Sequence, residues 1–138
     1  PELSEEEILN IINGNNFSSE LLVYGKLPLM TNHYCYLGKS NKCYQECDKK
    51  CMLNKEYYLK DRMNFLFRVL PDNIQTVTTI YNSKISSIDT NEINNVTNFR
   101  IDILDESVEE INEIINTVKQ GNRLEGKEYT NGNLNRTV

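Results

Sequence analysis

Two segments of the chain place apolar residues at helical spacing, and a serine stands at the start of each. The first follows Ser4 and carries Ile8, Ile11 and Ile12 on one face. Glutamate stands three residues after Ser4, which is typical of a capping box and predicts a helix that ends at Gly14. The second opens at residues 105–107 and ends at Gly121. Its apolar positions are Val108, Ile111, Ile114, Ile115 and Val118.

Shorter apolar runs predict β-strands. Residues 20–24 are almost wholly apolar, as expected of a strand covered on both faces, and residues 99–104 form another short strand. Three further runs are rich in β-branched and aromatic residues and are separated by turn residues, which predicts a small antiparallel meander. These runs are 56–60, 65–70 and 74–81.

The remaining segments have weaker patterns. We expect an irregular loop over residues 25–40 and a helix from Ser86 or Asp89 to about Val96. The polar segment 123–138 is rich in glycine and asparagine, and we expect it to be a mobile C-terminal tail.

The order of the predicted elements indicates the fold class. The predicted order is helix, buried strand, insertion, helix, buried strand and helix. This order is typical of an α/β fold with a parallel sheet. Two such strands are too few for a complete barrel or doubly wound sheet. We therefore predict a partial α/β domain over residues 1–122, with a small antiparallel β module that carries four cysteines inserted at about 31–82.

The expected domain is a piece of a larger protein, since the chain opens at Pro1 and runs straight into helix-forming residues. A piece of this kind would leave strand 20–24 or strand 99–104 with an unpaired edge. Unpaired edges favour pairing with another chain, so we expect a dimer or a swapped assembly.

The net charge and the composition limit the classes of partner that the chain can bind. The 138 residues carry a formal net charge of −5, which argues against a broad nucleic-acid surface and leaves room only for a small basic site. No apolar stretch is long enough to span a membrane, and no signal peptide is recognisable. We expect a cytoplasmic protein, in which disulfides are rare.

Four cysteines lie within seventeen residues, and this cluster is the main candidate site. They are Cys35, Cys43, Cys47 and Cys51. Thiolates select zinc or iron–sulfur clusters, and a reducing compartment favours metal binding over disulfides. Two alternatives remain open: reduced cysteines that serve as small buried apolar residues, and disulfides. A cysteine nucleophile paired with His33, the only histidine, is the weakest interpretation because His33 stands two residues from Cys35.

The spacing of the cysteines limits how they can bind a metal. It matches neither paired C-x-x-C zinc motifs nor a ferredoxin run. On one straight helix Cys43 and Cys51 would lie about 12 Å apart along the axis, too far for a single zinc ion. Either the segment is not one straight helix, or one of these cysteines is not a ligand. Lys49 and Lys50 would lower the thiol pKa values and favour the thiolates.

Other polar residues are weaker candidates. Asp61 and Arg62 follow a predicted strand, where aspartate commonly bonds to a turn. Arg100 and Asp102 alternate with isoleucines and share one face of their strand, which predicts an internal ion pair or a substrate contact. No paired carboxylates, no Ser-His-Asp set and no HExxH motif occurs, so catalytic residues stay unassigned.

Several segments together resemble peptidase family U32, the collagenase-like peptidases. The similar segments are ELLVYGKLPLM at 20–30, Tyr34-Cys35, Cys43-x-x-x-Cys47, YYLKDR at 57–62, TIYNS at 79–83, FRID at 99–102 followed by Glu106, and faintly YTNG at 129–132 with Arg136. The resemblance covers about residues 20–136 and is densest over 20–82.

The resemblance implies a fragment of a TIM-like barrel, from its late portion, with a cysteine site that holds an iron–sulfur cluster in some relatives. It implies a peptide or protein substrate, while other members hydroxylate RNA bases or a quinone precursor. The rest of the parent protein would then be a partner. The chain departs from the family at Thr76, where a fourth cysteine is expected, and carries Cys51 as an extra one. A zinc-stapled structural module and a non-catalytic remnant therefore stay open as alternatives.

Overall fold

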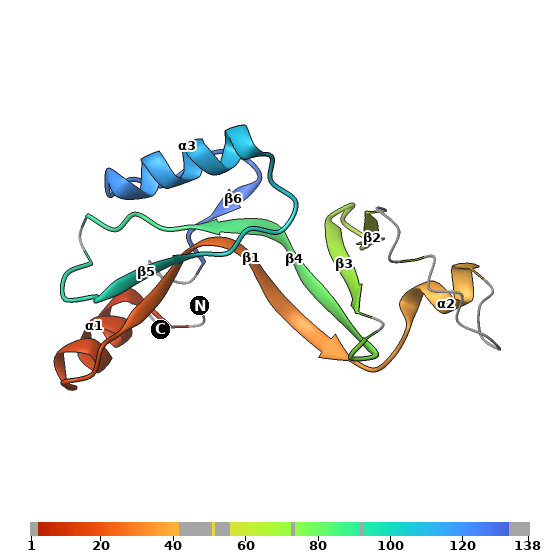
Figure 1. Cartoon of the computed structure of the whole chain (residues 1–138), viewed down its shortest axis with the longest axis horizontal. Coiled ribbons are helices and arrows are strands. Elements are labelled where there is room, and N and C mark those ends of the chain that lie inside the picture. Colours follow the sequence, from red (N-terminus) through yellow and green to blue (C-terminus); the bar gives the residue numbers. More distant parts are fainter. Residues whose placement is uncertain (1–2, 42–50, 52–55, 73, 92, 133–138) are drawn as a thin grey trace. The chain divides into compact units, whose positions relative to one another are not determined.

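The computed structural model describes residues 3–41, 51, 56–72, 74–91 and 93–132, and it contains three helices and six strands in these ranges (Figure 1). The helices are α1 (Glu5–Asn13), α2 (Tyr36–Asn41) and α3 (Val108–Lys119). The strands are β1 (Glu20–Asn32), β2 (Tyr57–Lys60), β3 (Leu66–Asp72), β4 (Val77–Ser87), β5 (Asn98–Ile101) and β6 (Tyr129–Thr130).

The strands form one mixed sheet in the order β2-β3-β4-β1-β5, with β6 paired to β4. The pairs β2–β3 and β3–β4 are antiparallel, which confirms the predicted meander. The pair β1–β5 is parallel, with Glu20 opposite Asn98 and Leu22 opposite Arg100. The chain is therefore a mixed α/β fold that consists mostly of sheet.

The chain folds into two compact units. The first unit comprises residues 1–27 and 84–138, and the second comprises residues 28–83. Strands β1 and β4 each contribute residues to both units. The β insertion expected at about 31–82 lies within the second unit.

The core of the first unit contains an apolar cluster with residues from β1. Its buried members are Ile8, Leu21, Val23, Ile88 and Ile93, and Ile12, Val96, Ile101 and Val118 pack against them. Ile8 and Ile12 of α1 and Val118 of α3 belong to this cluster or pack against it. Burial of this apolar surface stabilises the unit.

Both helices with serine caps were predicted correctly. The hydroxyl of Ser4 accepts from the Glu7 N–H while the Glu7 carboxylate accepts from the Ser4 N–H. The same reciprocal pair joins Ser107 and Glu110 at the start of α3. These bonds use only residues within one turn, which explains why they are legible in the sequence.

The irregular loop expected over residues 25–40 was wrong, because strand β1 and helix α2 occupy most of this segment. The strand continues to Asn32, and α2 begins at Tyr36. Gly25 makes the continuation possible, because its φ of 141° is unfavourable for other residues. A Cβ at this position would also lie 2.7 Å from the Asp102 carbonyl oxygen. The glycine marks a close approach within a strand, where a loop had been expected.

One further expectation was wrong, and the expected sheet edge holds for only one of its two candidate strands. No helix occurs in the described residues between 86 and 97; β4 runs through Ser87 instead, and Asp89 Oδ1 accepts from the Asn91 N–H in a local turn. Strand residues 20–24 do not form an edge, since β1 lies between β4 and β5 in the sheet. The strand at that end of the described sheet is β5, and the dimer stays a prediction.

The segment from residue 123 onward contains β6. Ile85 and Ser86 of β4 stand opposite Tyr129 and Thr130 in a parallel pair. The Ile85 N–H also donates to the Glu128 carbonyl at 2.9 Å. The part of this segment up to residue 132 therefore contributes to the first unit, whereas residues 133–138 lie outside the described ranges.

The close approach at Gly25 leads to the first prediction. Gly25→Ala should lower the free energy of unfolding by about 1–3 kcal/mol, because alanine strains the backbone and meets Asp102. Urea unfolding measures the change. Gly14→Ala is the matched control, because Gly14 has an ordinary φ of −81°. An equal effect of both substitutions would contradict the role given to Gly25.

Candidate functional site

The four cysteines are only partly covered by the described residues. Cys35 is exposed and Cys51 is half-buried, while Cys43 and Cys47 lie outside the described ranges. In the part of the chain that is described, no three His, Cys, Asp or Glu side chains gather around one point as metal ligands would. The chemistry of the four thiols fits a metal that prefers sulfur. Their convergence stays a prediction.

The backbone around Cys35 is held by the residue at the end of β1. The Asn32 Oδ1 accepts from the Tyr34 N–H at 2.9 Å, and its Nδ2 donates to the Tyr36 hydroxyl at 2.9 Å. The rings of Tyr34 and Tyr36 meet edge to face, with centroids 5.1 Å apart. Cys35 therefore has a fixed backbone and a side chain that solvent can reach.

His33 lies beside the turn between β3 and β4. Its Nδ1 is 3.0 Å from the carbonyl oxygen of Thr76. Thr76 has a φ of 56°, which is rare for a β-branched residue. The sequence predicted neither this contact nor the strained turn. Thr76 is also the position at which the U32 resemblance would place a cysteine, so the fold brings this position next to the segment that carries Cys35.

Asp61 organises a turn, as the sequence predicted. Its Oδ1 accepts from the N–H groups of Met63 and Phe65, each at 2.8 Å. Asn64, between them, has a φ of 69°, which asparagine tolerates better than most residues. Local hydrogen bonding thus accounts for Asp61, and Arg62 beside it is exposed.

The ion pair predicted for Arg100 is present, but it is not internal. Arg100 Nε lies 3.0 Å from Asp102 Oδ1, and its Nη1 lies 3.2 Å from Glu20 Oε1. The Asp102 carboxylate, followed by Glu20, raises the pKa of the guanidinium. About half of each side chain is exposed, so solvent screens these pairs strongly.

A buried tyrosine connects β1 to the start of α3. The Tyr24 hydroxyl donates to Glu106 Oε1 at 3.0 Å, and the residue is 2% exposed. The other oxygen of Glu106 accepts from the N–H groups of Leu104 and Asp105. Burial and the adjacent Glu106 carboxylate raise the pKa of Tyr24 above its usual range. Sequence reasoning missed this pair, because its members are 82 residues apart.

The pKa of Tyr129, in β6, is also raised. Burial is the main cause of its raised pKa, and four carboxylates add to it, led by Glu128 and Glu113. Each negative charge disfavours the formation of a phenolate. Both tyrosines therefore remain neutral acids that can donate a hydrogen bond at physiological pH.

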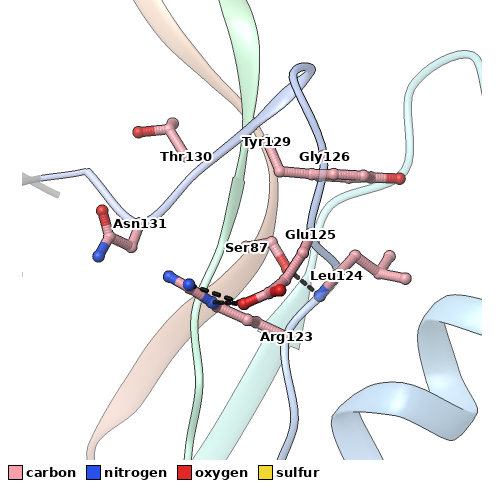
Figure 2. Close-up of a pocket in the computed structure, with 8 residues that line it drawn as sticks. All are labelled: Ser87, Arg123, Leu124, Glu125, Gly126, Tyr129, Thr130 and Asn131. Carbon is pink, nitrogen blue, oxygen red and sulfur yellow. Dashed lines mark hydrogen bonds and ion pairs between the residues drawn. The ribbon is translucent and has the colours of Figure 1, made fainter.

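A small polar pocket lies between the end of β4 and the segment that leads into β6 (Figure 2). Its volume is about 220 Å³, and its lining residues are Ser87, Arg123, Leu124, Glu125, Gly126, Tyr129, Thr130 and Asn131. Arg123 donates to Glu125 Oε1 through Nε and Nη2, at 3.1 and 2.8 Å. Ser87 Oγ accepts from the Leu124 N–H at 2.8 Å. The polar groups of Arg123, Glu125 and Ser87 that line the pocket therefore bond to other lining residues.

Comparison with known proteins identifies no relative. No family model, no curated protein and no solved structure matches the chain. Among the described helices, none has the length and hydropathy needed to cross a membrane.

The buried Tyr24–Glu106 bond leads to the second prediction. Tyr24→Phe should lower the free energy of unfolding at pH 8 by about 2 kcal/mol, because one oxygen of Glu106 loses its partner. Since the folded state raises the pKa of Tyr24, its stabilisation is complete below the ordinary tyrosine pKa of about 10 and is lost as the pH rises further. Stability should fall by about 1.4 kcal/mol per pH unit for this group above that point.

The measurement is urea unfolding between pH 7 and the alkaline range in which the protein still refolds. Tyr24→Phe should show a shallower alkaline decline than the unaltered protein, with Tyr129 causing the remainder. Tyr34→Phe is the control, because Tyr34 is 57% exposed. An unchanged alkaline slope in Tyr24→Phe would contradict the buried donor.

Proposed function

We propose that this chain is the late, C-terminal portion of a U32-type, collagenase-like peptidase whose principal site is formed by cysteine thiolates. Cys35, Cys43, Cys47 and Cys51 would hold an iron–sulfur cluster or a zinc ion. The observation that carries the proposal is the concentration of four cysteines in seventeen residues, within segments that resemble the family. The group would supply electron transfer or Lewis acidity if it is an iron–sulfur cluster, and Lewis acidity or structural bracing if it is zinc.

The exposure of Cys35 and the restrained backbone beside it support this proposal. Its side chain is exposed, so a metal can reach it without opening a core. The bonds of Asn32 to Tyr34 and Tyr36 fix the adjacent backbone. Pre-positioned ligands lose less conformational freedom on binding, which favours a specific site over an accidental one.

The arrangement of the first unit supports a barrel origin. Strands β1 and β5 are parallel, and Ile12 of α1 and Val118 of α3 pack against the apolar cluster that contains Leu21 and Val23. Glu20 of β1 and Arg100 of β5 form a half-exposed ion pair across these two strands. Parallel strands with helices packed against their apolar residues suit a TIM-like barrel, in which helices surround the strands.

Three alternatives have their own consequences. An iron–sulfur-dependent hydroxylase would act on RNA or on a small aromatic substrate. A zinc-stapled module would have a structural role, and Thr76 in place of a family cysteine favours it or a non-catalytic remnant. For a peptidase we expect a peptide or protein substrate, a cytoplasmic location and no membrane association.

Metal analysis of the full-length polypeptide, purified natively without oxygen, tests the proposed site. We expect a stoichiometric metal whose content falls severalfold in Cys35→Ser, because the substitution removes a thiolate ligand. Iron with acid-labile sulfide would favour the hydroxylase class, and zinc would favour the structural module. Met63→Leu is the control, since it replaces an exposed sulfur side chain of the second unit that we do not place at the site. A folded protein without metal would overturn the proposed site.

Proteolysis requires a separate measurement. If the thiolate site serves the peptidase, cleavage of a collagen-like substrate by the full-length protein should fall in Cys35→Ser and persist in Met63→Leu. Cleavage that survives each of the four Cys→Ser substitutions would separate proteolysis from the metal site.

A further inference from the structure

Strand β5 is the last strand of the sheet order β2-β3-β4-β1-β5, and among the described strands it pairs with β1 alone (Figure 1). We propose that this edge binds the same edge of a second copy of the chain, in an antiparallel pair centred on Ile101. The inference goes beyond the proposed function and does not rest on it, because it concerns the edge of β5 and not the cysteines.

The backbone groups of β5 point alternately toward β1 and away from it. The N–H groups of Asn98 and Asp102 both donate to carbonyl oxygens of residues 19–24, each at 2.9 Å. Because peptide groups along a strand alternate in direction, the N–H and carbonyl groups of Phe99 and Ile101 point away from β1. Backbone groups of this kind at a sheet edge are a template for another strand.

The side chains at this edge have the same chemical pattern in both directions along the chain. On an extended backbone Phe99, Ile101 and Ile103 share one face, and Arg100 and Asp102 share the other. Phe99 and Ile103, the two ends of the apolar face, are each 42% exposed. The two charged residues stand on either side of Ile101 and have opposite sign. Such a strand is complementary to itself when two copies pair antiparallel.

Charge selects one register for this pair. With Ile101 opposite Ile101 of the second copy, Arg100 stands opposite Asp102 of that copy, and the same contact recurs by symmetry. These are non-hydrogen-bonded positions, where the side chains of neighbouring antiparallel strands lie closest. Phe99 then stands opposite Ile103 of the second copy. A pair centred on Arg100 or on Asp102 would place like charges opposite each other, which destabilises strand pairing.

An open groove of about 500 Å³ lies beside this edge, within the first unit. The apolar side chains that line it are Phe99 and Ile101 of β5 and Ile115 and Val118 of α3. In the selected register Ile103 of the second copy lies beside Phe99, so pairing also removes apolar surface from water. The contact is only one strand long, and we therefore expect a dissociation constant in the micromolar range rather than an obligate dimer.

Analytical ultracentrifugation of the 138-residue chain over a series of concentrations tests the inference, with a reductant present so that disulfides cannot link the copies. We expect a reversible equilibrium between monomer and dimer. Arg100→Glu and Asp102→Lys should each raise the dissociation constant at least about 10-fold, because each places like charges opposite at both symmetric positions. Lys127→Glu is the matched control and should dimerise normally, since it changes the net charge as Arg100→Glu does but alters an exposed residue outside β5.

Mixing the two variants separates the proposed pairing from a general effect of charge or stability. At this edge the Arg100→Glu chain presents two carboxylates, and the Asp102→Lys chain presents two cations. An equimolar mixture should form a heterodimer at least as tight as the unaltered dimer, because every facing pair then has opposite charges. Circular dichroism of each variant verifies that it is folded. A mixture of folded variants that stays monomeric would overturn the proposed register.

Amide hydrogen exchange of the unaltered chain identifies the edge without any substitution. The Ile101 N–H should become protected as the concentration rises, whereas the Asp102 N–H, which bonds to Tyr24, should be protected throughout. A chain that is monomeric up to about 1 mM, or a dimer in which the Ile101 N–H exchanges freely, would overturn the inference.

A second occupant of the edge has a different signature. Protection of the Ile101 N–H in a monomeric full-length polypeptide would assign the edge to a strand of the parent protein and overturn the pairing of two copies. None of these results changes the metal content, so the cysteine site is decided separately by its own metal analysis.

Discussion

Hydrogen bonding along both edges of β1 is the constraint on which the other features depend. The Val23 carbonyl accepts from the Ile88 N–H at 3.0 Å, and the Tyr24 carbonyl accepts from the Asp102 N–H at 2.9 Å. These bonds satisfy backbone groups of a strand whose side chains Leu21 and Val23 are buried in the core. The same strand continues to Asn32, where the segment with the candidate ligands begins. Loss of this pairing would therefore disrupt the core of the first unit.

Polar contacts in this protein have different energetic weight according to their burial. The bond from the buried Tyr24 to the half-buried Glu106 is partly shielded from water, and its loss leaves a carboxylate oxygen without that donor. The ion pairs of Arg100 are half exposed and contribute less, although their geometry is good. The number of polar contacts therefore says less about stability than their burial does.

The candidate metal site combines an exposed side chain with a restrained backbone. Its proposed ligand Cys35 is exposed, as metal entry requires, while Asn32 restrains the backbone beside it. A metal held by Cys35 and the other cysteines would stabilise the folded chain, because the unfolded chain does not present these ligands together.

Local sequence determined the two capped helices, the antiparallel meander and the turn at Asp61, because each depends on hydrogen bonds or side-chain alternation within a few residues. It also identified the cysteine cluster as the candidate site. The tertiary structure decided the length of β1, where Gly25 permits a close approach to Asp102, and it excluded a helix from the described residues between 86 and 97. It alone paired His33 with Thr76 and Tyr24 with Glu106, across 43 and 82 residues. Such contacts depend on how distant segments pack, and no short-range pattern encodes that packing.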